Sequence, residues 1–366
     1  MQRRSFLKQA GLSAIAGGAV VAAPAVAQEM PVLEWRLASS FPRHLETLFG
    51  TGERFCRYVS EASNGRFLIR PFAAGELAPA LQVFDAVSGH AVECGHTVSY
   101  YYQDRDPAFC FDAAVPFGLT ASQMNAWMFE ADGLSLTRAL FEPFGIVNLP
   151  MGNTGVQMGG WYPREIKTTA DFKGLKIGAA GLAAQVLARL GAVPQVLAAD
   201  EILPALGSGA LEAAEFAGPA DDEALGIHRM ARYCYFPGWW TAGTQVSLYL
   251  NQGAWESLPP AYQAIIEAAS RSAHVAMTSR YEARNPAALR RLVADGAELR
   301  AFPRGVVDAA FEAAAQVYQA LSDQHPQFKA LHERYMGFRD AALPWWRVGE
   351  GAYGQSLSTA LANRRS

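Results

Sequence analysis

Two segments of the chain carry most of the polar side chains that could bind a small molecule. The first runs from Gly152 to Trp161 and combines four glycines with the amides Asn153 and Gln157. Glycine lets the backbone approach a ligand closely, and amide side chains both donate and accept hydrogen bonds. The segment is therefore a candidate ligand-binding loop, although a flexible crossover between two lobes would require the same glycines.

The second segment, residues 214–222, has Glu215 at the carboxyl end of a predicted strand. Open α/β sheets bind ligands beyond that end of their strands. A carboxylate there can coordinate a hard cation or accept hydrogen bonds from a ligand. The neighbouring Asp221 and Asp222 are predicted to cap the helix that follows, which is a structural role.

Two aromatic runs are candidates for the apolar walls of a binding cleft. One is Tyr100–Tyr102, and the other lies within residues 233–240. Aromatic side chains supply large apolar surfaces with a few polar tips. We expect Tyr101 and Trp240 to contact a ligand, and ordinary core packing to account for most other members of both runs.

Signatures of catalysis are missing from the sequence. It contains no G-x-G-x-x-G or Walker-type phosphate loop, no G-x-S-x-G nucleophile elbow and no H-x-x-x-H pair. The formal net charge is -3, without a block of Lys and Arg, and the four cysteines match no metal-binding spacing. We therefore predict a binding protein that is not an enzyme, has no nucleic-acid partner and buries its cysteines.

The elements that must position these residues alternate between strand and helix. The hydrophobic pattern predicts this alternation over residues 33–94 and again over 175–216. Amphipathic helices follow at 260–284, 286–295, 306–321 and 328–341. Because alternation implies parallel strands, the predicted fold class is α/β, with a ligand cleft between two lobes and long C-terminal helices.

The predicted domain boundaries follow from this order of elements. Residues 28–152 form a first lobe, which part of 242–300 completes. Residues 153–241 form the second lobe, and residues 301–366 form C-terminal helices that bridge lobes or subunits.

The first 27 residues have the pattern of a signal peptide. Arg3 and Arg4 precede a short apolar stretch, and Ala25–Ala27 supplies the small-x-small pattern of a cleavage site. Paired arginines predict export to the periplasm by the twin-arginine route, and a Sec signal is the alternative.

Four sequence motifs are shared with one known family. They are WRLASSFP at Trp35–Pro42, HTVSYYY at His96–Tyr102, GNTGVQMGGW at Gly152–Trp161 and PGWW at Pro237–Trp240. In this order they resemble the DctP-type substrate-binding proteins of TRAP transporters, most closely the α-keto-acid-binding branch. The resemblance implies a periplasmic two-lobed protein that closes on a small organic acid, a 2-oxo acid or related monocarboxylate. It would pass this ligand to TRAP permease subunits in the membrane.

The resemblance also implies site residues. Gln157 and Glu215 match the glutamine and glutamate of the family's cleft, and Phe216 replaces a tryptophan that contributes its backbone carbonyl. With Thr241, these residues form the candidate ligands of a bound cation such as sodium or calcium. In this branch the C-terminal helix can exchange between subunits, so a homodimer is a further expectation.

Two positions depart from the family's pattern. Gly178 stands where the family usually has an arginine that pairs with the ligand carboxylate, and Thr241 stands where the keto-acid branch has an acid. Losing such a partner weakens the binding of a buried, charged ligand by about 2–5 kcal/mol. We expect a ligand bulkier than pyruvate that depends less on a carboxylate, unless Arg36, Arg43 or Lys176 reaches the site. The alternatives are a neutral or amine-bearing ligand, and a sensory binding protein.

Overall fold

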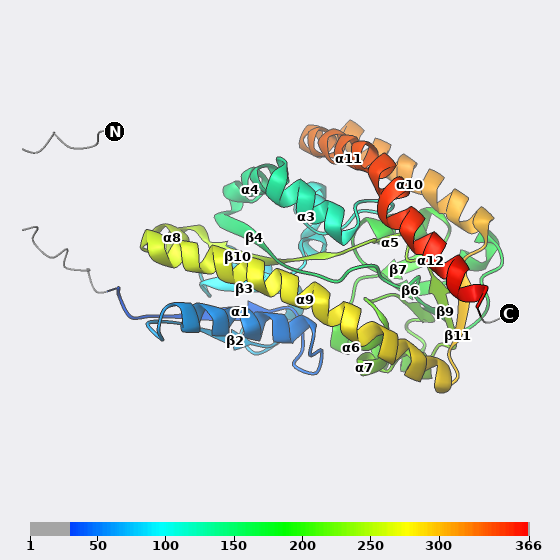
Figure 1. Cartoon of the computed structure of the whole chain (residues 1–366), viewed down its shortest axis with the longest axis horizontal. Helices are drawn as coiled ribbons and strands as arrows, with labels where there is room; N and C mark the ends of the chain where they lie inside the picture. The colour runs from blue at the N-terminus through cyan, green and yellow to red at the C-terminus, as the bar shows by residue number, and fades with distance from the viewer. Residues whose placement is uncertain (1–29, 365–366) are drawn as a thin grey trace, which may run out of the picture. The chain divides into compact units, whose positions relative to one another are not determined.

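Two β-sheets form the framework of residues 30–364, which the computed structural model describes (Figure 1). The predicted signal peptide, residues 1–27, lies outside the described residues. Helices pack around both sheets, so the predicted α/β class is confirmed. Within the described residues, none of the helices combines the length and the apolar character that crossing a membrane requires.

The first sheet has the strand order β2-β1-β3-β10-β4. Its strands are β1 (Leu33–Ser39), β2 (Phe67–Phe72), β3 (Cys94–Thr97), β4 (Ile146–Asn153) and β10 (Gln245–Asn251). β1 pairs in parallel with β2 and β3, whereas β10 is antiparallel to β3 and β4. β3 begins at Cys94, whereas the hydrophobic pattern of residues 91–94 predicts a strand that starts at Ala91. The amides of Ala91 and Val92 instead bond the Ala86 carbonyl near the end of helix α2 (Val83–Ser88).

The second sheet has the order β11-β9-β5-β8-β6-β7. Its strands are β5 (Trp161–Tyr162), β6 (Lys176–Gly178), β7 (Val193–Gln195), β8 (Ala213–Ala214), β9 (Tyr233–Phe236) and β11 (Glu298–Ala301). β6 pairs in parallel with β7 and β8, and the connections are α5 (Gly181–Arg189) and α6 (Ala199–Ser208). This is the βαβαβ unit predicted from residues 175–216. Because β6 and β8 are parallel, the start of α5 and Glu215 emerge at the same edge of the sheet.

Shorter helices surround the sheets and join the strands. The α-helices are α1 (Leu48–Ala62), α3 (Ala121–Glu130), α4 (Gly133–Phe141), α7 (Pro219–Leu225) and α8 (Gln252–Glu256). The 3-10 turns are η1 (Ala80–Gln82), η2 (Ser99–Tyr102), η3 (Pro107–Asp112), η4 (Glu142–Phe144), η5 (Thr169–Phe172) and η6 (Ile227–Arg229).

One long helix, α9 (Pro260–Ala294), packs against α1 and β4 and, further along, against α7 (Figure 1). The prediction of two helices that separate before Pro286 is wrong. A proline inside a helix removes a backbone hydrogen bond and crowds the preceding turn. However, Tyr281 on one side of Pro286, and Ala288 and Leu292 on the other, are all buried. Tertiary packing on both sides of the proline therefore outweighs its local effect.

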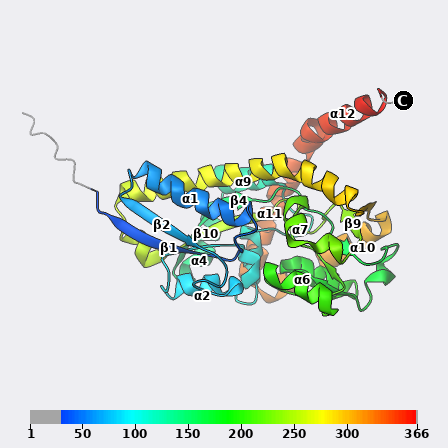
Figure 2. The same cartoon turned by 90° about the horizontal axis from the view of Figure 1, so that it is seen from below.

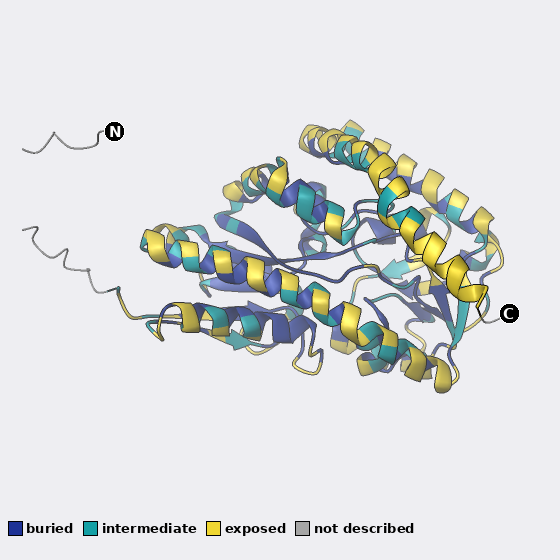
Figure 3. Ribbon diagram, viewed as in Figure 1, coloured by how far each residue is buried: buried dark blue, intermediate teal, exposed yellow. Residues whose placement is uncertain are grey.

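The C-terminal part consists of α10 (Arg304–Gln324), α11 (Pro326–Trp346) and α12 (Ala352–Ala362). α10 packs against α5, and α11 packs against α10, η3 and α3. A kink at Gly349, within the π-helical turn η7 (Arg347–Gly351), separates α11 from α12. α12 projects from the neighbouring elements in Figure 2, and none of its residues is buried (Figure 3).

The lobe boundaries remain a prediction. From Val32 on, the chain clusters as one compact unit. The first sheet takes its strands from residues 33–153 and 245–251, and the second from residues 161–301.

Candidate functional site

Four of the residues predicted for the site line one cavity. Glu215 follows β8, Gln157 lies between β4 and β5, and Trp240 and Thr241 lie between β9 and β10. The other lining residues are Tyr100, Ala114, Ala180, Gly181, Leu182, Ala183 and Thr244. The cavity has a volume of about 20 Å³, which is room for about one water molecule. A ligand with several non-hydrogen atoms therefore requires these walls to move apart.

Glu215 has no basic neighbour in this cavity. None of the described residues that line it is a Lys, Arg or His. Burial, followed by the charge of Asp222, raises the pKa of Glu215 from 4.5 to about 8, and a hydrogen bond from the Ala180 amide opposes the shift. Such a carboxylate ionises readily only when a positive group approaches it. Glu215 is thus suited to meet a cation.

Two threonines orient the side chain of Gln157. Its Nε2 atom donates to Thr154 Oγ1 and to Thr244 Oγ1, each at 3.1 Å. Because both amide hydrogens are used, Oε1 is the atom that Gln157 can offer to a cation or ligand. Amide and carboxylate oxygens are the ligands that hard cations prefer.

Thr241 adds a neutral oxygen to the same wall. Its hydroxyl lies 3.1 Å from the hydroxyl of Thr244 and accepts a hydrogen bond from the Gly243 amide at 3.2 Å. Residues 30–364 contain no group of three or more His, Cys, Asp or Glu side chains arranged for a metal ion. A cation bound here would therefore depend on one carboxylate together with neutral oxygens.

Three predicted site residues do not line this cavity. Tyr101 packs edge-on against Tyr100 with ring centres 5.3 Å apart, and Tyr100 occupies the cavity wall instead. Asn153 is fully buried at the end of β4, where it accepts a hydrogen bond from the Gly155 amide at 2.9 Å. Phe216 packs against a cluster of buried apolar side chains. The ligand contacts of Tyr101 and Asn153, and the cation contact of Phe216, remain predictions.

The predicted capping role of Asp221 and Asp222 is wrong. Gly218 is the residue before α7, and both aspartates lie inside the first turn, where their amides bond the Gly218 carbonyl. Their carboxylates accept hydrogen bonds from other elements: the Tyr281 hydroxyl donates to Asp221, and Trp161 Nε1 donates to Asp222 at 2.9 Å. Burial raises the pKa of Asp222 to about 7. These two carboxylates join α7 to its neighbours, and the charge of Asp222 raises the pKa of Glu215.

Sequence reasoning missed Tyr100, Thr244 and the start of α5. Tyr100 belongs to the predicted aromatic run, but three successive tyrosines do not reveal which one faces a cavity. The start of α5 follows strand β6 at the carboxyl edge of the sheet. Because ligands bind at that edge in open α/β sheets, its position could have identified it as part of the site. Thr244 carried no signal, because it reaches the cavity through a loop whose path the sequence does not specify.

The basic residues considered as substitutes for the family's arginine lie elsewhere. Arg36 pairs with Glu93, and Arg43 pairs with Glu76, each at 2.8 Å. Lys176 is exposed on β6. None of the three lines the cavity.

Gly178 does not line the cavity either. A Cβ atom added there would lie 3.0 Å from Leu211 Cδ1 and 3.7 Å from Ala214 Cβ. The Cβ atom of a side chain at this position would therefore point towards Leu211 and Ala214. Leu211 would have to move to make room for it.

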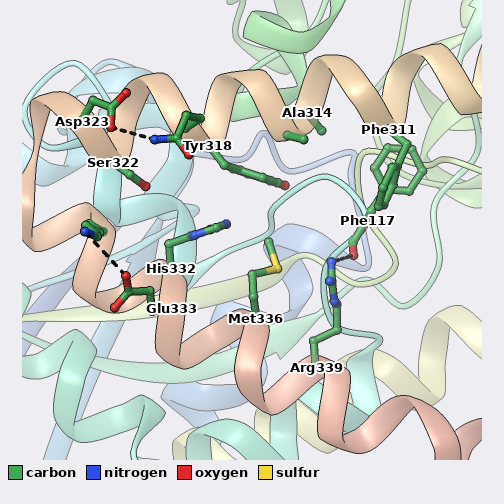
Figure 4. A pocket seen from close by; sticks show the side chains of 13 residues that line it. Phe117, Phe311, Ala314, Tyr318, Ser322, Asp323, His332, Glu333, Met336 and Arg339 are labelled. Atoms are coloured by element: carbon green, nitrogen blue, oxygen red, sulfur yellow. Dashed lines mark hydrogen bonds and ion pairs between the residues drawn. The ribbon is translucent and has the colours of Figure 1, made fainter.

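A larger cavity, of about 420 Å³, lies between α10 and α11 (Figure 4). Phe117 and Phe311 lie at one end of it, beside Arg339, and Asp323 and Glu333 lie at the other end. None of the residues predicted for the site lines this cavity.

Comparison with known proteins identifies relatives along almost the entire chain. The DctP family, bacterial extracellular solute-binding proteins of family 7, matches residues 38–324. A monocarboxylate 2-oxoacid-binding periplasmic protein of Nostoc sp. strain PCC 7120 is 41% identical over 365 residues, which cover 98% of this chain and 100% of the relative.

Solved structures of TRAP transporter solute-binding proteins have the same fold. The protein from Bordetella bronchiseptica RB50 is 43% identical with a TM-score of 0.90, and the match covers 91% of this chain and 99% of that one. It is a dimer with calcium and picolinate in one site and an apo second site. The protein from Pseudoalteromonas atlantica T6c, with bound sodium and pyruvate, is 32% identical with a TM-score of 0.86 and coverages of 88% and 99%.

Proposed function

Because this chain belongs to family 7 of the bacterial extracellular solute-binding proteins, we propose that it captures a small organic acid in the periplasm and delivers it to the membrane subunits of a TRAP-type transporter. Members of this family are binding subunits of transporters and not enzymes. The observation that carries the proposal is the cavity in which Glu215, Gln157, Trp240 and Thr241 meet.

The proposed ligand is a monocarboxylate with a second donor atom next to the carboxylate, namely a 2-oxo acid or a pyridine-2-carboxylate. Relatives of this chain bind pyruvate and picolinate, which share that arrangement. It allows a ligand to hold a cation through two atoms. Because none of the described residues that line the cavity is basic, a carboxylate ligand buried there needs a cation as its partner.

The proposed cation is sodium or calcium. The Glu215 carboxylate and Gln157 Oε1 would hold it, with the Phe216 carbonyl and the Thr241 hydroxyl as further oxygen ligands. The bound cation would neutralise Glu215, whose pKa is raised to about 8 by burial and by Asp222. All of these donors are oxygens, which agrees with the preference of hard cations.

The carboxylate of Glu215 also favours one alternative class of ligand. A ligand with an amine would pair with Glu215 directly and would need no metal ion. The two alternatives differ in their need for a metal ion, because only the first loses its affinity when calcium is chelated and sodium is replaced by an organic cation such as choline.

A homodimer is proposed through the C-terminal helix. Tyr353, Leu357 and Leu361 recur at four-residue spacing on α12 and are all exposed, so they form an apolar stripe along one face. The relative from B. bronchiseptica is a dimer. Export by the twin-arginine route, through residues 1–27, is proposed from the sequence alone.

A thermal-shift screen of the mature chain tests the proposed function. Pyruvate, picolinate, amino acids and sulfonates are offered with calcium, with sodium or with EDTA. A ligand at about 100 times its Kd stabilises a protein by about 2.7 kcal/mol, so tight binding will be visible. We expect stabilisation by pyruvate or picolinate that is lost in EDTA when choline replaces every sodium ion, and no new product in the mixture. Failure of every acid to stabilise the chain, or conversion of one to product, would refute the proposal.

A further inference from the structure

The first turn of helix α5 forms one wall of the cavity. Ala180, Gly181, Leu182 and Ala183 all line it. The bond from the Ala184 amide to the Ala180 carbonyl closes the first turn, so the amides of Gly181, Leu182 and Ala183 have no partner within the helix. No side chain caps this end, because the preceding residue is Ala180. The cavity wall therefore contains backbone donors that a bound group can satisfy.

Gly181 allows this turn to approach the opposite wall. Its φ of +63° is in the left-handed region that favours glycine. A Cβ atom at this position would also lie 3.0 Å from Tyr100 Cβ. Any other residue would strain the backbone and crowd Tyr100.

A carboxylate already occupies part of this helix end. The Ala180 amide lies near the Glu215 carboxylate and lowers its pKa. The amino end of a helix carries a partial positive charge, and its free amides point outward along the axis. The same two properties favour a second carboxylate, provided that a cation offsets the charge of Glu215.

Trp240 adds an unpaired buried donor to the wall of the same cavity. It is only 2% exposed and lines the cavity. Its indole Nε1 is buried and has no hydrogen-bond partner among residues 30–364. A buried donor without an acceptor is costly, and an oxygen of a ligand in this cavity would satisfy it.

We propose that the first-turn amides of α5 and the indole N–H of Trp240 bind the ligand carboxylate, in place of the arginine that the family resemblance implies at the position of Gly178. The inference rests on the proposed function and adds the atoms that recognise the acid. Neutral donors take over the role of the guanidinium, and the cation at Glu215 supplies the positive charge.

The test uses two matched pairs of variants and calorimetric titration with picolinate in the presence of calcium. Ala183→Pro removes one first-turn amide at a position where helices tolerate proline, whereas Ala183→Gly keeps that amide. Trp240→Phe removes the indole N–H in the cavity, whereas Trp239→Phe makes the same change in a neighbour that does not line it. Melting temperatures check that each variant is folded.

We expect Ala183→Pro and Trp240→Phe each to weaken picolinate binding at least about ten-fold relative to its matched control, the loss typical of a hydrogen bond to a charged group. Picolinamide, which lacks the carboxylate, should lose less affinity in both variants. If Ala183→Pro does not fold, the tryptophan pair decides the outcome.

Two different results would contradict the proposed function and the present inference. Wild-type protein that binds neither picolinate nor pyruvate would overturn the proposed function together with this inference. Wild-type protein that binds them, while Trp240→Phe and any folded Ala183→Pro bind as tightly as their controls, would overturn this inference alone.

Discussion

Replacing Glu215 with glutamine separates the charge of this residue from its shape. Glu215→Gln retains an acceptor for the Ala180 amide and removes the ionisable group. We expect two opposite effects on stability. The unliganded chain should become more stable near neutral pH, and calcium should no longer stabilise it.

The size of the first effect follows from the pKa of Glu215. This pKa rises from 4.5 to about 8 on folding, and one pKa unit corresponds to about 1.4 kcal/mol. At pH 7 the folded chain keeps a proton that the unfolded chain has released, so Glu215 destabilises the fold by about 3 kcal/mol. Its contribution to stability is most favourable below pH 4.5 and declines as the pH rises towards 8. Glutamine has no such dependence.

Urea unfolding at several pH values, with EDTA or with calcium, measures both effects. Exposed Glu312 on α10 provides a control, because Glu312→Gln should leave the free energy of unfolding unchanged. The reasoning is refuted if Glu215→Gln is less stable than wild type in EDTA at pH 8. It is also refuted if calcium stabilises the variant and the wild type equally.

Four further predictions concern other parts of the site and the chain. Thr244→Val removes a hydroxyl that holds Gln157 and should lower calcium affinity about ten-fold in calorimetry, whereas Thr244→Ser should preserve it; equal affinities would contradict this orienting role. Gly178→Arg should gain little affinity for pyruvate and should melt earlier, because its side chain meets Leu211; a large gain in the same titration would mean that the arginine has no replacement. Calcium should support tighter binding than sodium, since Glu215 and the ligand carboxylate together carry two negative charges, and competition titrations that favour sodium would count against this. Ending the chain after residue 346 should yield monomers in analytical ultracentrifugation, and a dimer that persists would exclude α12 as the interface.

The sequence predicts the fold well where hydrophobic patterns are long or repeated. The unit over residues 175–216 is predicted correctly because each strand and helix has its own period and turn residues. The break predicted at Pro286 fails because the buried neighbours Tyr281 and Ala288 hold α9 together, and local propensity contains no information on that packing.

The site is predictable only in part. Glu215 can be predicted from its position at the end of a strand. The glycine-rich loop offers two amides, and only the family resemblance favours Gln157 over Asn153, which does not line the cavity. Which of three tyrosines faces inward depends on the path of η2, and Tyr100 was missed for that reason. The donors at the start of α5 were missed because they are backbone amides, which every residue except proline has.

A crystal structure of the mature chain grown with calcium and picolinate tests the central claim most directly. We predict calcium bound to Glu215 and Gln157, with the picolinate carboxylate at the start of α5 and beside Trp240. Picolinate in the cavity between α10 and α11, or a ligand beside Glu215 without any cation, would contradict the account.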